Sequence, residues 1–525
     1  MAENSNYTNV EALPEIVGRM HKSFDSGKTR PLEYRKQQIR NVLKMLDENK
    51  EELAQAMAKD MGKPRFEAFA HEIMPAEYEA GQFLAHMDKW LKPEKPFLAG
   101  EYPIFLFDSG TVQKSPQGVV LIISPWNYPI RLSLNPLIGA IAAGNTVVMK
   151  LSEICEHTTA LTKTLIEKYL DPDCVQVVLG GPEETGQLMK QRFDHFFYTG
   201  NPAVGKIVGR AAMDQLAKVT LELGGKNPTF VANSCLDIST AASRIMWGKT
   251  INCGQTCVAP DYVLAEKDVY APLVKAMSLY PESVFGKNIK SSPDFGRVVS
   301  KRQFDRLYNL LSTTKGKFVT GSLEECDPET LYIPPTIITD IGLDDPLMQD
   351  EIFGPILPVI SIDSIDEGLD IVKTKEYPLA LYAFANKKDS SFILQNTRSG
   401  SISINDTVLQ MVTARLPFGG FGNSGLGSYS GKYSIDVFSH QRTVLNRSIS
   451  FPPPGVDSVR MPPYENWKYK ILSTAIFTTP KEASKSIFGY LFRLIPGWRL
   501  LGVTPSFIVA FFKGKRTLPP ISKNK

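Results

Sequence analysis

The chain has 525 residues, of which 43% are hydrophobic and 22% are charged, as in ordinary globular proteins. This composition excludes collagen, a coiled coil and global disorder, and the net charge of +4 gives no sign of a nucleic-acid-binding protein. The six cysteines are too sparse for a disulfide scaffold, and the N-terminal MAENSNYTNV lacks the basic start and apolar run of a signal peptide. We therefore expect an intracellular, reducing compartment.

Residues 12 to 92 are predicted to be helical, because apolar positions recur three and four residues apart. Residues 109 to 118, SGTVQKSPQG, are typical of an extended hairpin or arm. Beyond them, apolar runs typical of buried strands alternate with helical patterns. The predicted strands are 119–124, 146–150, 175–180, 195–199 and 218–223, and the helices between them are 134–144, 157–170, 183–191 and 202–213. This alternation predicts an α/β fold with a doubly wound, Rossmann-like parallel sheet, whose ligands lie beyond the carboxyl ends of its strands.

A second α/β segment is predicted from Glu222 to about residue 415, and FPPPG (451–455) indicates a stiff linker after it. The stretch 486–512 is apolar and rich in aromatic residues, and a helix of that length is about 40 Å long. Pro496 and Pro505 interrupt it, so we expect a monotopic or re-entrant membrane anchor rather than a span. A helix packed on the rest of the protein is the alternative.

A glycine-containing turn follows the predicted strand 195–199. The stretch GNPAVGKI, 200 to 207, is close to the P-loop of nucleotide hydrolases, but Ile207 stands where Ser or Thr would bind magnesium. What remains is a helix N-terminus with free amides, which favours a phosphate or pyrophosphate site. A plain strand-to-helix turn is the alternative.

Two cysteines lie four residues apart in NCGQTCVAP, 252 to 260. No second cysteine pair and no paired histidines accompany Cys253 and Cys257, so a zinc site is not expected. A thioredoxin-like motif needs two intervening residues, and here there are three. A catalytic nucleophile and a cysteine buried in the core remain as interpretations.

Further motifs accompany this loop along the chain. They are SPWNYP (124–129), LELGGKNP (221–228), QDEIFGPILP (349–358) and LPFGGFGNSGLGSYSG (416–431). In series, over residues 15 to 445, they resemble the aldehyde dehydrogenase superfamily, and most of all its class 3 and fatty aldehyde dehydrogenases, including those of yeast and fungi. The resemblance implies NAD(P)-dependent oxidation of medium- and long-chain aliphatic aldehydes to carboxylic acids through a cysteine thiohemiacetal and thioester.

The resemblance also implies roles for individual residues. Cys257 matches the nucleophile, whose thiolate attacks the aldehyde carbon. The Asn127 side chain and the Cys257 backbone N–H match the oxyanion hole, and Glu222 matches the base that activates the hydrolytic water. Cys253 has no catalytic role in the family and is expected to pack in the core.

The cofactor is expected to be NAD, with NADP possible and no metal required. Lys150 and Glu153 match residues that hold the adenosine ribose, and Glu153 would repel a 2′-phosphate. Leu151 replaces the proline that the family usually has there. The other positions that match cofactor-binding residues are Trp126, Gly200, Asn201, Val204, Gly205, Glu351 and Phe353.

The implied domain organisation has four parts. These are a dinucleotide-binding domain (1–104 and 119–221), a catalytic domain (222–429), an oligomerisation arm (105–118 and 430–445) that pairs across a homodimer, and a linker with a membrane-associated tail (446–525). The expected location is an intracellular membrane, that of the endoplasmic reticulum, a lipid droplet or the mitochondrial outer membrane, with the catalytic domain facing the cytosol. The alternatives are another aldehyde class, transfer of the thioester to coenzyme A, which the presence of Glu222 disfavours, and a non-catalytic scaffold of the same fold.

Overall fold

The computed structural model describes residues 7–96, 108–447, 449 and 460–469. The chain divides into two compact units, one comprising residues 1–90 and 115–440 and the other residues 91–114 and 441–525. The stretch expected to be a membrane anchor, 486–512, lies outside the described residues. Among those that are described, no helix combines the length and apolar character needed to cross a membrane.

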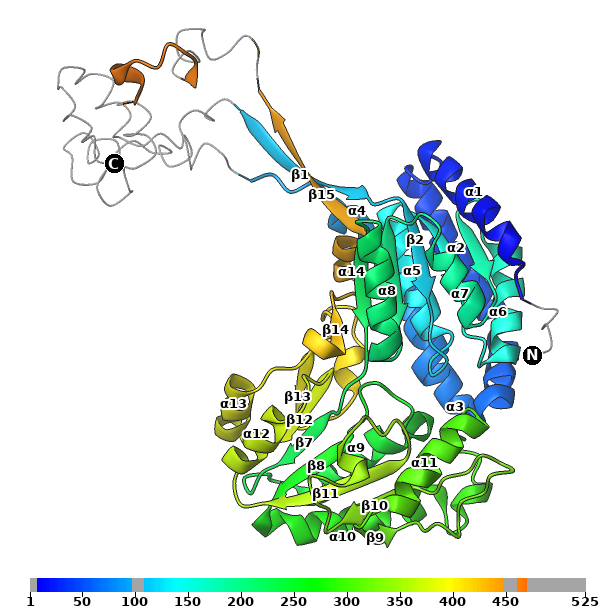
Figure 1. Ribbon diagram of the computed structural model, residues 1–525, viewed down its shortest axis with the longest axis vertical. Helices are drawn as coiled ribbons and strands as arrows, with labels where there is room; N and C mark the ends of the chain where they lie inside the picture. The colour runs from blue at the N-terminus through cyan, green and yellow to red at the C-terminus, as the bar shows by residue number, and fades with distance from the viewer. Residues whose placement is uncertain (1–6, 97–107, 448, 450–459, 470–525) are drawn as a thin grey trace. The chain divides into compact units, whose positions relative to one another are not determined.

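A six-stranded sheet organises the first half of the larger unit, with strand order β14-β6-β5-β2-β3-β4 (Figure 1). Its strands are β2 (Val119–Ile123), β3 (Thr146–Lys150), β4 (Val175–Val178), β5 (His195–Thr199), β6 (Lys218–Glu222) and the short β14 (Gly425–Leu426). The first five pair in parallel, and β14 joins β6 antiparallel. All residues of β2, β3 and β5 are buried, which explains why they appear in the sequence as continuous apolar runs.

The helices between these strands confirm the doubly wound fold. They are α5 (Arg131–Ala143), α6 (Glu156–Tyr169), α7 (Pro182–Met189) and α8 (Pro202–Asp214). Helix α5 begins three residues earlier than predicted, directly after the SPWNYP motif. Asn201 caps α8, because its side chain accepts a hydrogen bond from the Val204 backbone N–H.

The N-terminal region is helical, as its apolar periodicity predicts. It comprises α1 (Leu13–Asp25), α2 (Leu32–Met61), α3 (Arg65–Glu67), the π-helical turn η2 (Ala68–Ile73) and α4 (Met74–Trp90). Helices α2 and α4 pack against each other and against α5. This packing brings the turn η2 against the start of α5.

A second, seven-stranded sheet has the order β13-β12-β7-β8-β11-β10-β9 (Figure 1). Its strands are β7 (Pro228–Val231), β8 (Tyr262–Glu266), β9 (Lys317–Thr320), β10 (Thr336–Thr339), β11 (Ile356–Ile362), β12 (Ala380–Phe384) and β13 (Ser401–Ile404). Only β9, at the edge, is antiparallel. The helices of this region are α9 (Ile238–Thr250), α10 (Lys267–Phe285), α11 (Lys301–Thr313), α12 (Ile365–Lys373) and α13 (Lys387–Asn396).

Strands β1 (Ser109–Pro116) and β15 (Ser439–Asn446) form a two-stranded sheet, cyan and orange in Figure 1. This pairing joins two segments of one chain, and pairing across a dimer, which the resemblance implies, stays a prediction. Within the stretch expected to be arm, Lys432–Val437 forms the helix α14. Helix α14 packs against α5, because Ser434 and Ile435 are buried there.

Candidate active site

The carboxyl ends of the parallel strands collect the predicted site residues at one edge of the six-stranded sheet. The register pairs Ile123 of β2 with Lys150 of β3, and Thr199 of β5 with Glu222 of β6. The loop after β2 carries Asn127, so the SPWNYP and LELGGKNP motifs meet at this edge. Ligands of doubly wound sheets bind at this edge.

The loop that precedes Cys257 has an unusual backbone. Asn252, Cys253 and Gly254 have φ angles of 50°, 54° and 71°, which is three consecutive residues in the left-handed region. Only glycine fits at the third position, because a Cβ there would lie 2.3 Å from the Gly354 carbonyl oxygen. This tight turn presses the loop against the QDEIFGPILP motif.

The Gln255 side chain fixes the loop further. Its amide donates to the carbonyl oxygens of Asn252 (3.0 Å) and Arg297 (2.9 Å), and its Oε1 accepts from the Val299 backbone N–H (2.9 Å). Both the Nε2 and the Oε1 atom of Gln255 therefore bind backbone groups of the surrounding loops. The loop presents Cys257 from a rigid support.

The two cysteines of the motif lie in different environments. Cys253 is 0% exposed and packs among Phe295, Phe304 and other apolar residues. Cys257 is partly exposed and lines a pocket. The cysteines of the described chain are free, and within those residues no group of three or more His, Cys, Asp or Glu side chains is arranged to hold a metal.

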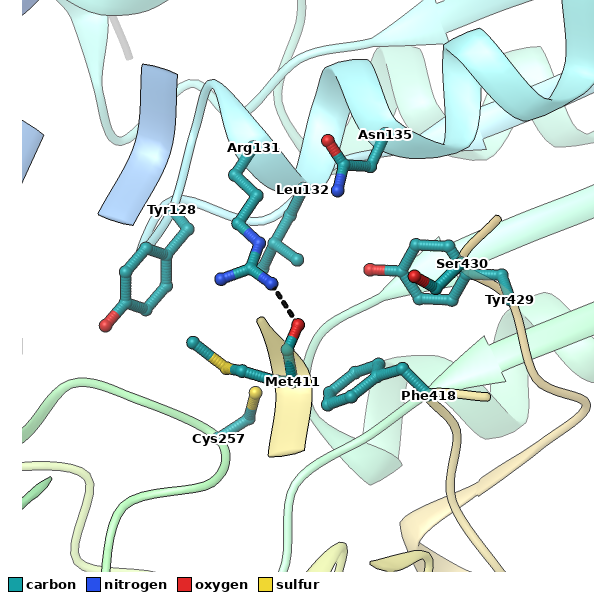
Figure 2. A pocket seen from close by; sticks show the side chains of 9 residues that line it. All are labelled: Tyr128, Arg131, Leu132, Asn135, Cys257, Met411, Phe418, Tyr429 and Ser430. Atoms are coloured by element: carbon teal, nitrogen blue, oxygen red, sulfur yellow. Dashed lines mark hydrogen bonds between the residues drawn. The ribbon is translucent and has the colours of Figure 1, made fainter. Parts of the chain in front are cut away.

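Figure 2 shows the Cys257 side chain facing a pocket whose walls come from three stretches of chain. Its other lining residues are Tyr128, Arg131, Leu132, Asn135, Met411, Phe418, Tyr429 and Ser430. The wall is mostly aromatic and aliphatic, with one guanidinium. Arg131 donates a hydrogen bond to the Met411 carbonyl oxygen, drawn as the dashed line in Figure 2.

Burial and charge set the protonation of the thiol. Burial raises the pKa of Cys257 to about 12, and the carboxylates of Glu351 and Glu222 add to the rise. The Arg131 guanidinium acts in the opposite direction and lowers the pKa of this thiol. Burial and the neighbouring carboxyl groups thus favour the protonated thiol, and Arg131 favours the thiolate.

Glu222 is one of the two carboxyl groups that act on this thiol. It ends β6, is 2% exposed, and neither of its carboxylate oxygens has a hydrogen-bond partner among the described residues. Burial raises its pKa well above the usual range of a carboxyl group. A buried carboxyl group without partners that interacts electrostatically with a thiol is typical of a general base.

Asn127 is held beside the thiol loop. Its side-chain Nδ2 donates to the Gln255 carbonyl oxygen at 3.1 Å, which directs the amide toward the loop of Cys257. The backbone carbonyl oxygen of Asn127 accepts hydrogen bonds from Lys63 Nζ (3.1 Å) and Asn252 Nδ2 (2.9 Å). Asn127 therefore lies against the loop of Cys257 and Glu222 acts electrostatically on its thiol, although neither of them lines the pocket. Their catalytic roles stay a prediction.

The residues predicted to hold the adenosine half of a cofactor lie at the same sheet edge. Lys150 is buried and forms an ion pair with Glu153, with 2.5 Å between Nζ and Oε2. The Gly200 N–H donates to the Glu222 carbonyl oxygen at 3.0 Å, and a Cβ on Gly200 would lie 2.2 Å from the Tyr198 hydroxyl. Gly205 sits against Leu223, where a Cβ would come within 2.7 Å of a methyl group.

The residues predicted at the nicotinamide end are also close together. The rings of Trp126 and Phe353 meet edge to face with centroids 5.4 Å apart. Phe353 has a φ of 52°, a strained value for a bulky residue. The Glu351 carboxylate lies against Gly224, where a Cβ would be 2.2 Å from its Oε2, and burial raises the pKa of Glu351 to about 8.

Several residues of the site were missed by sequence reasoning. Tyr128 and Arg131 line the pocket directly after Asn127, so their place beside a predicted site residue was the available signal. Met411 carried no signal, because it lies in a short 3-10 helix, Leu409–Met411, outside the motifs. Lys63 and Glu72 lie far from the motifs in sequence and meet them only through the packing of helices.

A doubly wound sheet with a thiol-bearing loop and a glycine turn at its carboxyl edge defines an oxidoreductase that uses a dinucleotide. The family model described as "Aldehyde dehydrogenase family" matches residues 3–444. The chain belongs to the aldehyde dehydrogenase family, and it oxidises aldehydes with NAD(P). The resemblance stated from the motifs is confirmed, as is the α/β fold.

Individual relatives cover nearly the whole chain. Aldehyde dehydrogenase family 3 member B1 of Bos taurus is 43% identical over 473 residues, covering 89% of this chain and 98% of the relative. Member A2 of the same family from Mus musculus is 42% identical over 476 residues, covering 90% and 96%. The substrate-bound structure of AldH from Staphylococcus aureus is similar with a TM-score of 0.83 at 36% identity, covering 87% of this chain and 98% of that one.

Proposed function

We propose that the protein oxidises medium- and long-chain aliphatic aldehydes to carboxylic acids, with Cys257 as nucleophile, Asn127 as oxyanion donor and Glu222 as general base. The observation that carries this assignment is the partly exposed thiol at the wall of a mainly apolar pocket, with a buried, unpartnered carboxylate acting on its pKa. Relatives named as family 3 aldehyde dehydrogenases support the same reaction class.

The residues present suffice for the covalent steps. Cys257 Sγ, once deprotonated, bonds to the aldehyde carbon, and the carbonyl electrons move onto oxygen, where Asn127 Nδ2 and the Cys257 N–H stabilise them. Bound NAD supplies the acceptor for the hydride that the carbon loses. The thioester that remains on Cys257 is hydrolysed by a water whose proton Glu222 takes, which releases the acid and restores the sulfur anion.

The chain fits a dinucleotide at the sheet edge. Gly200 packs against Tyr198, where a Cβ would lie 2.2 Å from the hydroxyl group, so the turn before α8 requires glycine. The N-terminus of the 13-residue helix α8 follows this turn, and its backbone amides suit a pyrophosphate. Asn201, Val204 and Gly205 belong to that turn. Lys150 and Glu153 would hold the adenosine ribose, and the Glu153 carboxylate disfavours the 2′-phosphate of NADP. Trp126, Glu351 and Phe353 would position the nicotinamide end.

The pocket wall predicts a dependence on chain length. Each methylene group buried against Leu132, Met411 or Phe418 contributes about 0.8 kcal/mol, or about fourfold in kcat/KM. The expected result, for aldehydes from C2 to C18 assayed with NAD and with NADP, is a kcat/KM that rises steeply from C2 and reaches a plateau, with NAD preferred. A preference for acetaldehyde or for benzaldehyde would show that the substrate belongs to another aldehyde class.

We also propose that the stretch 486–512 attaches the enzyme to an intracellular membrane, where long-chain aldehydes partition, with the catalytic domain facing the cytosol. The aromatic residues of this stretch and the basic residues after it support interfacial binding. Deleting residues 470–525 should move the protein from the membrane pellet to the supernatant, while kcat on a water-soluble C6 aldehyde stays within about twofold because, among the described residues, the site lies before them. A truncated protein that stays in the pellet would refute the anchor.

The domain boundaries belong to the same proposal. The dinucleotide-binding domain would comprise 1–104 and 119–221, the catalytic domain 222–429, and a homodimer would form through the arm at 105–118 and 430–445. The separate sheets on either side of Glu222 support the division between the first two domains.

A further inference from the structure

Three charged side chains that the chemistry does not use are buried between α2 and α4. Lys63 is 2% exposed, Glu67 9% and Glu72 0%. Glu72 belongs to the π-helical turn η2, a conformation that is rare in proteins and concentrated at functional sites. Buried charges persist only where each has partners, so the partners show what this cluster holds.

Glu72 binds the start of α5. One of its carboxylate oxygens forms an ion pair with Lys63, and the other accepts the backbone N–H groups of Ile130 and Arg131, both at 3.0 Å. A carboxylate at a helix N-terminus makes charge-assisted hydrogen bonds with amides that otherwise lack partners. These two amides lie three and four residues after Asn127, so Glu72 fixes the end of the loop that carries it.

Lys63 and Glu67 bind the backbone of Asn127 and of Asn252, respectively. Lys63 Nζ donates to the carbonyl oxygen of Asn127 at 3.1 Å, and the same oxygen accepts from Asn252 Nδ2 at 2.9 Å. Glu67 in turn accepts the backbone N–H of Asn252 at 2.8 Å. The contacts therefore run without a break from Glu72 through Asn127 to the left-handed turn that precedes Cys257.

We propose that Glu72, Lys63 and Glu67 are positioning residues that hold the Asn127 amide at the correct place against the loop of Cys257. None of the three lines the pocket itself, although Glu72 binds the backbone of Arg131 and Lys63 lies over the ring of Tyr128, both of which do. Their contacts with Asn127 and Asn252 are the ones that reach the loop of Cys257. This inference rests on the proposed function, since it assigns the cluster to the oxyanion donor. A buried ion pair adds little to stability on average, whereas a misplacement of about 1 Å in an active site costs about 100-fold in rate.

The test is a kinetic cycle between Glu72→Gln and Asn127→Ala in the full-length enzyme with hexanal and NAD. Glutamine at position 72 removes the negative charge that pairs with Lys63. It also leaves one side-chain oxygen as hydrogen-bond acceptor, where the carboxylate has two. The expected result is a fall of about 10- to 100-fold in the burst rate of NADH formation for Glu72→Gln, with the KM for NAD within twofold. In the Asn127→Ala background the same change should cost less than threefold, because the group it positions is gone.

Asp194→Asn is the matched control. Asp194 also accepts a backbone N–H, that of Val119 at 2.8 Å, but it lies at the amino end of β2, opposite the site. This variant loses the same charge and should keep the burst rate within twofold in both backgrounds.

Two results would overturn the inference, and they differ in what else they affect. Fully multiplicative losses from Glu72→Gln and Asn127→Ala would show that Glu72 does not act through Asn127, while leaving the oxyanion role intact. An unchanged burst rate in Asn127→Ala alone would overturn the oxyanion role and this inference together. If Glu72→Gln does not fold, the double variant Lys63→Met/Glu72→Met, which removes both charges, takes its place in the cycle with the same expected pattern.

Discussion

Replacing Cys257 with alanine is expected to abolish NADH formation from hexadecanal, with a loss of at least about 10³-fold, while NAD still binds. The loss follows because Cys257 supplies the thiol among the residues that line the pocket, and the hydroxyl groups there are much weaker nucleophiles. Binding of NAD is retained because the expected cofactor residues lie at the sheet edge and do not include the sulfur. NADH absorbance measures the first effect, and NAD titration by protein fluorescence measures the second.

Cys253→Ala is the matched control for this experiment. Its sulfur lies four residues away on the same loop, is fully buried, and packs in an apolar cluster. The substitution should lower stability through the small cavity it leaves, and the turnover of the folded protein should stay within a few fold. Retained turnover in Cys257→Ala would refute the nucleophile assignment, and a loss confined to Cys253→Ala would move it to that sulfur.

Replacing Glu222 with glutamine is expected to slow hydrolysis of the thioester much more than hydride transfer. The burst of NADH should remain, while the steady-state rate falls by about 10² to 10⁴, because the water loses its base. Burial raises the pKa of Glu222 well above its usual range, so the carboxylate form that acts as base increases as pH rises. The wild-type steady-state rate should therefore increase with pH from neutral to alkaline conditions, and the glutamine variant should lose this increase.

Glu79→Gln serves as the control for the pH effect. Burial raises the pKa of Glu79 to about 7, but its Oε1 accepts the Gly431 N–H at 2.6 Å and has a structural partner, unlike Glu222. This variant should keep the alkaline increase. A Glu222→Gln enzyme with both an unchanged burst and an unchanged steady-state rate would count against the base assignment, and so would an alkaline increase that persists in it.

The sheet could be predicted from sequence because its central strands are buried on both faces. Every residue of VVLII in β2 and of TVVMK in β3 is buried, so these strands appear as largely apolar runs between helical patterns. The site could be predicted because doubly wound sheets gather their ligand groups where strands end. Asn127 and Glu222 follow or end such strands, and the motifs that carry them are short and contiguous.

Other features of the fold and the site could not be predicted, mainly because they depend on contacts between distant parts of the chain. The pairing of β1 with β15 joins segments more than three hundred residues apart, and neither strand has a marked apolar pattern. The interaction of Glu72 with the start of α5 requires the packing of α4 and α2 on α5, and in sequence Glu72 resembles any charge on the solvent face of a helix. The left-handed turn at Asn252–Gly254 includes Cys253, a residue type that gives no indication of that conformation.

The surroundings of the thiol and of the proposed base affect the first step of the reaction. Cys257 and Glu222 both have raised pKa values, and each carboxylate near the sulfur disfavours its ionisation. Arg131 is the cation whose charge opposes this effect from within the pocket wall. Hydrogen bonds from Asn127 and the Cys257 N–H, in the proposed role of oxyanion donors, would act in a partly buried site, where they are stronger than in water.

The most direct test of the account is to identify the atom that carries the substrate. Glu222→Gln enzyme mixed with hexadecanal and NAD, then quenched in acid at the end of the burst, should yield a single acylated peptide by mass spectrometry, with the hexadecanoyl group on Cys257. A burst of NADH with the acyl group on another residue, or with no acylated peptide at all, would contradict the central claim that the reaction proceeds through the sulfur of Cys257.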